Sequence, residues 1–348
     1  MFFINIPIAA AALLILYRRV PESRNEDTPR GIDWPGAALA TLSLVALAYG
    51  FLAAPDHGFA SPRIFGALVL GMIFLALFFM VERRSDHPMV TLSLFRSRSF
   101  SGANLLTLFL YGALAAYSLF LSLNVIQVQG YRESLAGLAF LPFVLLLAGM
   151  SRWAGRLADR TGPRRWLILG PAIVGAGFFL TALVGLTEGP DDYWTTYLPG
   201  IVVFGIGMGF TVAPLTTTVM TSVDTRFAGT ASGVNNALSR VAGVLAIAVL
   251  GSVALFTFTG SVQGIATGAG LGAEARAALF DEAVKLGNAR VPAQVTPELA
   301  GDIARSLKLA FVHSFRIIMF ICSGLAWMSA VMAALFIRKH PGQRVSSS

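Results

Sequence analysis

Charged residues are scarce in this sequence. Asp, Glu, Lys and Arg make up 13% of its 348 residues, whereas 55% are hydrophobic. Soluble domains carry about 25% charged residues, so the composition excludes an ordinary water-soluble protein and indicates a chain that crosses a membrane several times. The net charge of +8 does not point to nucleic acid, because no basic run is interleaved with aromatic residues and most arginines flank apolar segments.

Cysteine and histidine are also rare. Cys322 is the single cysteine and lies in an apolar run, which excludes a disulfide framework and a thiolate metal site. The four histidines lie far apart, without the spacing of metal ligands. The sequence contains no phosphate-binding loop, nucleophile elbow or pair of catalytic carboxylates, so it does not predict an enzyme, a metal or a cofactor.

Long apolar runs dominate the rest of the chain. A membrane-spanning helix needs about 20 apolar residues to cross roughly 30 Å, and nine runs approach or exceed this length. They cover residues 1–17, 34–54, 64–81, 100–123, 134–151, 166–186, 194–220, 229–258 and 310–337. The predicted fold class is therefore an all-α polytopic membrane protein with about nine transmembrane helices. The first run is short, as expected for a helix whose beginning is missing.

The charge of the connecting segments predicts the orientation of the chain. Counting alternate segments as opposite faces, 17 Lys and Arg residues fall on one face and 7 on the other. Basic residues resist translocation, so the first face is expected to be cytoplasmic, with the C-terminal tail inside and Met1 outside. Localisation in the plasma or inner membrane follows.

The longest predicted outer segment covers residues 259–308. Small and apolar residues with interspersed charge predict a short surface helix from Ala273 to Leu286. Thr296 followed by Pro297 is typical of a helix start and is expected to begin the last helix. The segment is interpreted as a simple connector, and a lid over an external opening is the alternative.

A cluster of charge separates the fifth and sixth runs, in the sequence GRLADRTGPRR at residues 155–165. It predicts a tight loop at a membrane face. Gly155 would let two helices approach closely, and Asp159 would accept hydrogen bonds from the start of the following helix. The arginines would pair with Asp224 in one conformation and release it in another. The alternative is an anchor that holds anionic lipid.

This cluster resembles the signature loop of the major facilitator superfamily, of pattern G-x-L-a-D-r-x-G-r-r. The matching residues are Gly155, Leu157, Asp159, Arg160, Gly162, Arg164 and Arg165, with Pro163 as an interruption. The sequence FFINIPI at residues 2–8 is similar to the start of the sixth helix in the fourteen-helix drug/proton antiporter branch. AGTASGVNNALSRVAG at residues 228–243 resembles the penultimate-helix region of that branch.

The resemblance implies a division of the chain. Residues 1–17 would be the last helix of an N-terminal half, 18–99 two linking transmembrane helices with their cytoplasmic loops, 100–340 a C-terminal six-helix half, and 341–348 a cytoplasmic tail. The five helices that precede the sixth in this branch have no counterpart here. The expectation is therefore a C-terminal portion that requires the missing N-terminal half, from a truncated or wrongly started reading frame.

One basic residue is expected deep in the membrane. Arg240 follows the start of the eighth run by about eleven residues, roughly 16 Å at 1.5 Å per residue, and Asn236 lies one turn before it. Intramembrane ionisable residues are functional candidates, so the pair is interpreted either as lining a substrate cavity or as a buried pair that ties two helices together. Arg316 is expected to extend from the last run to the outer surface.

The seventh run carries GIGMG at residues 205–209 and Pro214 a turn later. A dinucleotide fingerprint would follow a strand and open a helix, so Gly205, Gly207 and Gly209 are interpreted as helix-packing residues. Pro214 would bend the helix and suit a moving gate.

The resemblance implies export of drugs or other amphipathic small molecules by alternating access, driven by a proton gradient. Proton coupling needs a membrane carboxylate, and no Asp or Glu lies in the middle of any run. The alternatives are a non-transporting membrane scaffold or partner subunit, and an inactive fragment. Substrate identity cannot be deduced from the sequence.

Overall fold

The structure is a computed structural model that describes residues 5–19, 33–58, 61–85 and 92–338. Two compact units divide the chain, residues 1–32 and residues 33–348, and each is considered by itself. The first contains α1 (Asn5–Arg19), a 15-residue helix. The predicted tail 341–348 lies outside the described residues.

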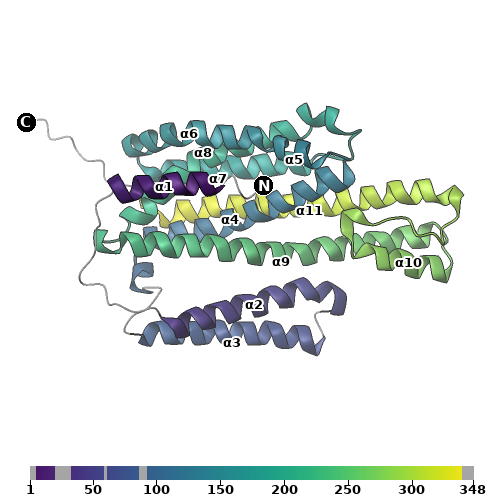
Figure 1. The fold of residues 1–348 in the computed structure, drawn as a ribbon, viewed down its shortest axis with the longest axis horizontal. Coiled ribbons are helices and arrows are strands. Elements are labelled where there is room, and N and C mark those ends of the chain that lie inside the picture. Colours follow the sequence, from purple (N-terminus) through teal and green to yellow (C-terminus); the bar gives the residue numbers. More distant parts are fainter. Residues whose placement is uncertain (1–4, 20–32, 59–60, 86–91, 339–348) are drawn as a thin grey trace, which may run out of the picture. The chain divides into compact units, whose positions relative to one another are not determined.

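All regular elements of the second unit that the structure describes are helical (Figure 1). The long helices are α2 (Trp34–His57), α3 (Pro62–Arg84), α4 (Arg98–Leu123), α6 (Leu141–Thr161), α7 (Pro163–Ala182), α8 (Tyr197–Thr221), α9 (Ala228–Gly268) and α11 (Pro297–Phe336). The short elements are η2 (Leu92–Arg96), η3 (Asn124–Val128), α5 (Glu133–Ala139), η4 (Pro190–Trp194), η5 (Thr225–Phe227), α10 (Ala273–Ala283) and η6 (Leu286–Asn288).

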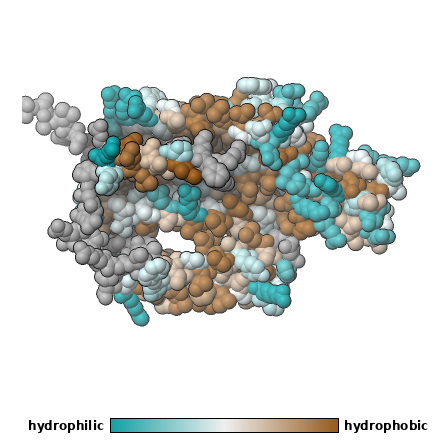
Figure 2. Space-filling model, in the orientation of Figure 1, coloured by the Kyte–Doolittle hydropathy of each residue, from teal (hydrophilic) through white to brown (hydrophobic). Residues whose placement is uncertain are grey.

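Eight of the nine predicted spans correspond to helices, or runs of helix, that are long and apolar enough to cross a membrane. The remaining run, the first, corresponds to α1, which is shorter than such a span. In the second unit, Figure 2 shows hydrophobic side chains over much of the middle and many hydrophilic ones at the end that carries α10. The prediction of an all-α polytopic membrane protein is confirmed.

Helices α4, α6, α7, α8, α9 and α11 run antiparallel to their sequence neighbours and form one bundle (Figure 1). We call the end that carries the turn between α6 and α7 the motif end, and the opposite end the α10 end. A polar cap fixes the start of α4 at the motif end: Ser97 Oγ accepts a hydrogen bond from Phe100 N and donates one of 2.9 Å to Ser222 O beyond α8. The starting point of α4 is thereby tied to the end of α8.

Large aromatic side chains fill the middle of this bundle. Tyr117 of α4 stacks on Phe178 of α7 with 4.3 Å between ring centroids, and Phe204 of α8 lies 5.1 Å from Tyr117. The Tyr117 hydroxyl is 3.2 Å from Thr181 Oγ1, so the buried ring has a polar partner. In a lipid environment such close packing and hydrogen bonding hold helices together, because lipid tails are as apolar as the side chains.

The hairpin of α2 and α3 packs on α9 through α2. Ser252 Oγ of α9 donates a short hydrogen bond to the carbonyl oxygen of Phe51 in α2. The start of α2 is fixed by Asp33, whose Oδ1 accepts a 2.8 Å hydrogen bond from Gly36 N. The boundary expected at residues 99 and 100, between linking helices and C-terminal half, stays a prediction.

The segment 259–308 is more ordered than a simple connector. Helix α9 has 41 residues and α11 has 40, about 60 Å each at 1.5 Å per residue, roughly twice the thickness of the membrane core. Their extensions and α10 share a buried apolar core. Its members include Val262, Ala266, Leu279, Ala283, Ile303 and Leu307. The predicted short helix is α10, and α11 begins at Pro297 as expected, although Thr296 provides no side-chain cap.

Candidate functional site

The charged cluster at residues 155–165 contains the turn between α6 and α7, and this turn is a single residue. Helix α6 continues to Thr161 and α7 begins at Pro163, so Gly162 alone connects them, with a φ of 85°. This left-handed conformation favours glycine, and Gly162 N donates a 2.8 Å hydrogen bond to Ala158 O. The expected loop is therefore wrong in extent, because most of the cluster lies within the last turns of α6.

The predicted role of Asp159 is not realised in this structure. Asp159 is exposed, and the start of α7 has no side-chain cap. Gly155 faces α8, but a Cβ there would lie 3.7 Å from the Ala213 Cβ, an ordinary contact. Close helix approach therefore does not require glycine at position 155.

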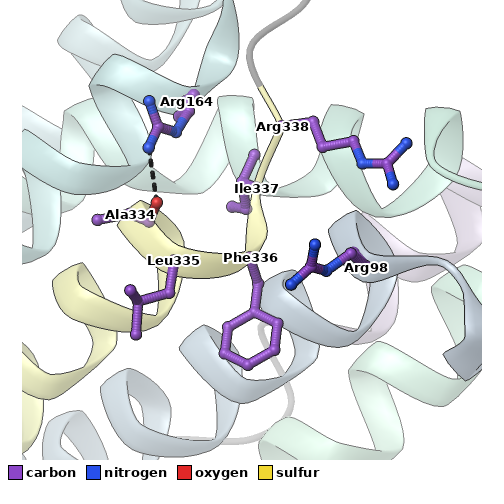
Figure 3. Close-up of a pocket in the computed structure, with 7 residues that line it drawn as sticks. All are labelled: Arg98, Arg164, Ala334, Leu335, Phe336, Ile337 and Arg338. Atoms are coloured by element: carbon purple, nitrogen blue, oxygen red, sulfur yellow. Dashed lines mark hydrogen bonds between the residues drawn. The ribbon is translucent and has the colours of Figure 1, made fainter.

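Arg164 is the member of the cluster that makes a long-range contact. Its Nη2 donates a 2.6 Å hydrogen bond to the carbonyl oxygen of Ala334, in the last turn of α11 (Figure 3). A cation at a helix C-terminus also interacts favourably with the helix dipole. Arg160 and Arg165 are exposed.

Asp224 is paired within its own turn. Its Oδ2 lies 3.6 Å from Arg226 Nε, and its Oδ1 accepts a hydrogen bond from Arg226 N. Among the described side chains, none of the arginines at positions 152–165 forms an ion pair with Asp224. The expected switch contact is thus not formed in this conformation.

Aromatic side chains join the three helices at the motif end, a feature that the sequence interpretation missed. Phe210 of α8 stacks on Trp166 of α7 at 5.0 Å and lies 5.8 Å from Trp153 of α6. Trp166 Nε1 also donates a 2.7 Å hydrogen bond to Thr161 Oγ1, across the turn at Gly162. The ring contacts with Phe210 and the Trp166–Thr161 hydrogen bond therefore both stabilise the turn between α6 and α7.

Asn236 and Arg240 lie on an exposed face of α9, one turn apart as expected. Neither residue ties two of the described helices together, and the choice between a cavity-lining pair and a buried pair stays a prediction. The neighbouring Asn235 ties two helices together, because its Nδ2 donates to Thr107 Oγ1 at 2.7 Å and to Asn104 Oδ1 at 3.2 Å, both in α4. One residue along a helix rotates a side chain by about 100°, which separates the two asparagines.

The glycines of α8 lie where neighbouring helices approach. A Cβ on Gly207 would lie 2.6 Å from Val174 N and 2.7 Å from Gly170 O, both backbone atoms of α7. Gly205 and Gly209 face α6 instead, where a Cβ would lie 3.0 Å from Leu146 Cδ1 and 2.8 Å from Met150 Cβ, respectively. Glycine at these positions thus gives α8 close contact with two helices.

Pro214 lies inside α8 and is buried. Its carbonyl oxygen accepts a 2.7 Å hydrogen bond from Thr218 Oγ1. This is the usual bond of a helical threonine to the carbonyl four residues before it, whereas the carbonyl that the proline leaves without an N–H partner is that of Phe210. The gate that the sequence suggested here stays a prediction.

Arg316 of α11 bonds to the end of α7, and its expected extension to the outer surface stays a prediction. Its Nε donates a 2.8 Å hydrogen bond to the carbonyl oxygen of Ala182, the last residue of α7. The interaction satisfies a carbonyl at a helix end, where no backbone partner exists. Arg316 and Arg164 therefore both bond to helix C-termini, at opposite ends of the α7–α11 contact.

An apolar pocket of about 340 Å³ opens at the α10 end, between α5, α6 and η4. Tyr131, Leu138, Pro142, Tyr193 and Trp194 are among its lining residues. The Tyr193 hydroxyl donates a 2.8 Å hydrogen bond to Ala139 O, which fixes one wall. Its size and apolar lining fall within the range of small-molecule sites.

Comparison with known proteins identifies the family. The family model described as Major Facilitator Superfamily matches residues 1–247. Multidrug resistance protein Stp of Mycobacterium tuberculosis is 33% identical over 72% of this chain and 46% of its own length. Puromycin resistance protein pur8 of Streptomyces alboniger is 34% identical over 72% of this chain and 50% of its own.

A third relative matches almost the whole chain. The tetracenomycin C resistance and export protein of Streptomyces glaucescens is 26% identical over 99% of this chain and 63% of its own length. The chain thus spans about half the length of most of the curated relatives it matches. Since the family model covers well over half of the sequence, the chain belongs to the major facilitator superfamily.

Proposed function

We propose that this chain forms the C-terminal part of a transporter that exports drugs or other amphipathic small molecules. The observation that carries the proposal is the polar, exposed face of α9, where Asn236 and Arg240 lie without tying helices together. Relatives named as drug resistance or export proteins support the class of substrate. The apolar pocket at the α10 end offers a surface for an amphipathic molecule.

Alternating access would supply the movement. The bundle of α4 to α11 would rock against a second half about a cavity that the exposed face of α9 borders. The motif end would face the cytoplasm of the cell, because the basic residues gather there. The arginines at the motif end would then control the opening of the cavity to the cytoplasm.

A proton gradient would drive export. The described spans carry their acidic residues in end turns, such as Glu82 in α3 and Asp159 in α6. The carboxylate that loads and unloads protons deep in the membrane would therefore be contributed by the second half. The residues of this chain would act on the substrate and on the conformational change.

Efflux of a fluorescent dye tests this function. Cells lacking other efflux pumps would express the protein from its native locus, be loaded with ethidium and be energised with glucose. Dye should leave faster than from cells without the gene, and a protonophore should abolish the difference. Membrane insertion without any difference in efflux would contradict transport and favour a scaffold or partner subunit.

A further inference from the structure

Three arginines line one pocket at the motif end. The pocket has a volume of about 270 Å³ and is lined by Arg98, Arg164 and residues 334–338. Arg98 begins α4, Arg164 lies in the first turn of α7, and Arg338 follows the end of α11. Figure 3 shows Arg164 reaching Ala334 on one side of the α11 terminus and Arg98 beside Phe336 on the other.

The positive charge in this pocket has no acidic partner within the described part of the chain. Neither Arg98, Arg164 nor Arg338 forms an ion pair with a described Asp or Glu. Arg164 uses Nη2 on the Ala334 carbonyl, while its buried Nε has no hydrogen-bond partner. The first turns of α4 and α7 also place the positive ends of two helix dipoles near the pocket. An anion would satisfy these groups.

An apolar stripe begins at the same place. Trp327, Met328, Val331 and Leu335 are 44%, 45%, 47% and 64% exposed, respectively. Val331 follows Trp327 and Met328 by four and three residues and precedes Leu335 by four, which places all of them on one face of α11. Leu335 also lines the pocket. The pocket therefore joins a basic end to an apolar surface that runs along a membrane-spanning helix.

We propose that this pocket binds the phosphate group of an anionic membrane lipid, with an acyl chain along the α11 stripe. Arginine matches a phosphate oxygen pair with its planar fork of donors. A free phosphate would use the arginines alone, whereas a lipid also covers Leu335 and the stripe that continues from it. The site uses neither Asn236 nor Arg240, so it does not depend on the proposed transport function.

Lipid binding to the purified chain tests the proposal. The protein in a nonionic detergent is titrated with dioleoyl phosphatidylglycerol or with dioleoyl phosphatidylcholine, and bound lipid is counted by native mass spectrometry. The test variant is Arg98→Gln/Arg338→Gln, which leaves the Arg164 hydrogen bond intact. The control is Arg156→Gln/Arg160→Gln, which removes the same charge from exposed residues at the same end but outside the pocket.

Phosphatidylglycerol should bind more tightly than phosphatidylcholine, and the test variant should weaken it roughly tenfold to thirtyfold. The control variant should bind as the native chain does, and both variants should keep the native melting temperature. Equal losses in both variants, or equal binding of both lipids, would overturn a specific site.

A second comparison separates lipid from free phosphate. Leu335→Asn keeps all three arginines but makes the beginning of the stripe polar, so it should weaken phosphatidylglycerol binding and leave the binding of inorganic phosphate unchanged. Displacement of the lipid by millimolar inorganic phosphate, with no effect of Leu335→Asn, would overturn the lipid assignment.

Discussion

The Arg164 guanidinium donates a hydrogen bond of 2.6 Å to the carbonyl oxygen of Ala334, joining the first turn of α7 to the last turn of α11. The two residues are 170 positions apart in the sequence. A charged donor strengthens this bond, and the acceptor is a carbonyl that the helix itself leaves unpaired. The contact makes the charged motif a part of the tertiary structure.

Replacing Arg164 with Ala should therefore destabilise the bundle. A hydrogen bond to a charged group contributes about 1.5–3 kcal/mol, so the apparent melting temperature in detergent should fall by several degrees. Arg165→Ala is the matched control, because Arg165 is adjacent and exposed. Equal changes in the two variants would show that the Ala334 contact contributes nothing beyond charge.

The adjacent residues Asn235 and Asn236 of α9 should differ in their contribution to stability. Asn235→Ala removes the hydrogen bonds to Asn104 and Thr107 of α4. Interhelical hydrogen bonds in membranes average about 0.6 kcal/mol each, so the variant should lose about 1 kcal/mol of stability, measured by thermal unfolding. Asn236→Ala should leave stability unchanged, because Asn236 is exposed. A stable Asn235 variant beside an unstable Asn236 variant would reverse the assignment.

Hydropathy was sufficient to locate eight spans, because a membrane helix must be apolar over its whole length. The turn at Gly162 also follows from local chemistry, since Gly and Pro stop one helix and start the next. The choice between Asn235 and Asn236 could not be made from the sequence. It depends on the rotation of α9 against α4, which many contacts along the helices determine together.

The ends of α9 and α11 show a second limit. The strongly apolar run ends near residue 258, so the sequence interpretation stopped the eighth span there, although α9 continues to Gly268. What stabilises the extension is packing against α10 and the start of α11, through residues such as Val262 and Leu279. These contacts join segments that are distant in sequence, and a local pattern does not contain them.

Helix contact at Gly207 gives a third prediction. Gly207→Ala places a methyl group 2.6 Å from Val174 N and 2.7 Å from Gly170 O, so α7 and α8 must separate. Overpacking of this kind costs about 1–3 kcal/mol, which thermal unfolding would detect. Gly251→Ala in α9 is the control, because its methyl group would meet nothing within 4 Å. Tolerance of alanine at both positions would argue against close packing as the reason for glycine at 207.

The segment of residues 259–308 should respond to acid through Glu282. Hydrogen bonds from the Lys285 side chain and from Arg290 N hold the pKa of Glu282 below its usual value. A carboxyl group with a lowered folded-state pKa stabilises the fold above its ordinary pKa of about 4.3 and loses this effect as pH falls through the folded-state value.

Amide hydrogen exchange at Arg290 would measure this effect. Exchange, corrected for its intrinsic pH dependence, should rise relative to α10 as the pH falls below about 4.3. Glu282→Gln should show fast exchange at Arg290 at neutral pH and little further change in acid. Protection of Arg290 that stays constant from neutral pH to pH 3 in the native chain would rule out the Glu282 contact as its cause.

Substitution of Arg240 tests the transport function without disturbing the packing of the bundle. Its side chain is exposed on α9 and forms no ion pair with the described acidic residues, so Arg240→Ala should leave the amount of protein in the membrane unchanged. If the residue borders the substrate cavity, ethidium efflux per molecule should fall several-fold, because a cation exposed to a low-dielectric cavity interacts strongly with whatever enters it.

Arg240→Lys keeps the charge and should retain more activity than the alanine variant. Arg226→Ala, at the exposed turn before α9, is the matched control and should have little effect. Efflux that follows protein abundance alone in all three variants would remove Arg240 from the transport pathway and leave the α9 face as an interface with the second half.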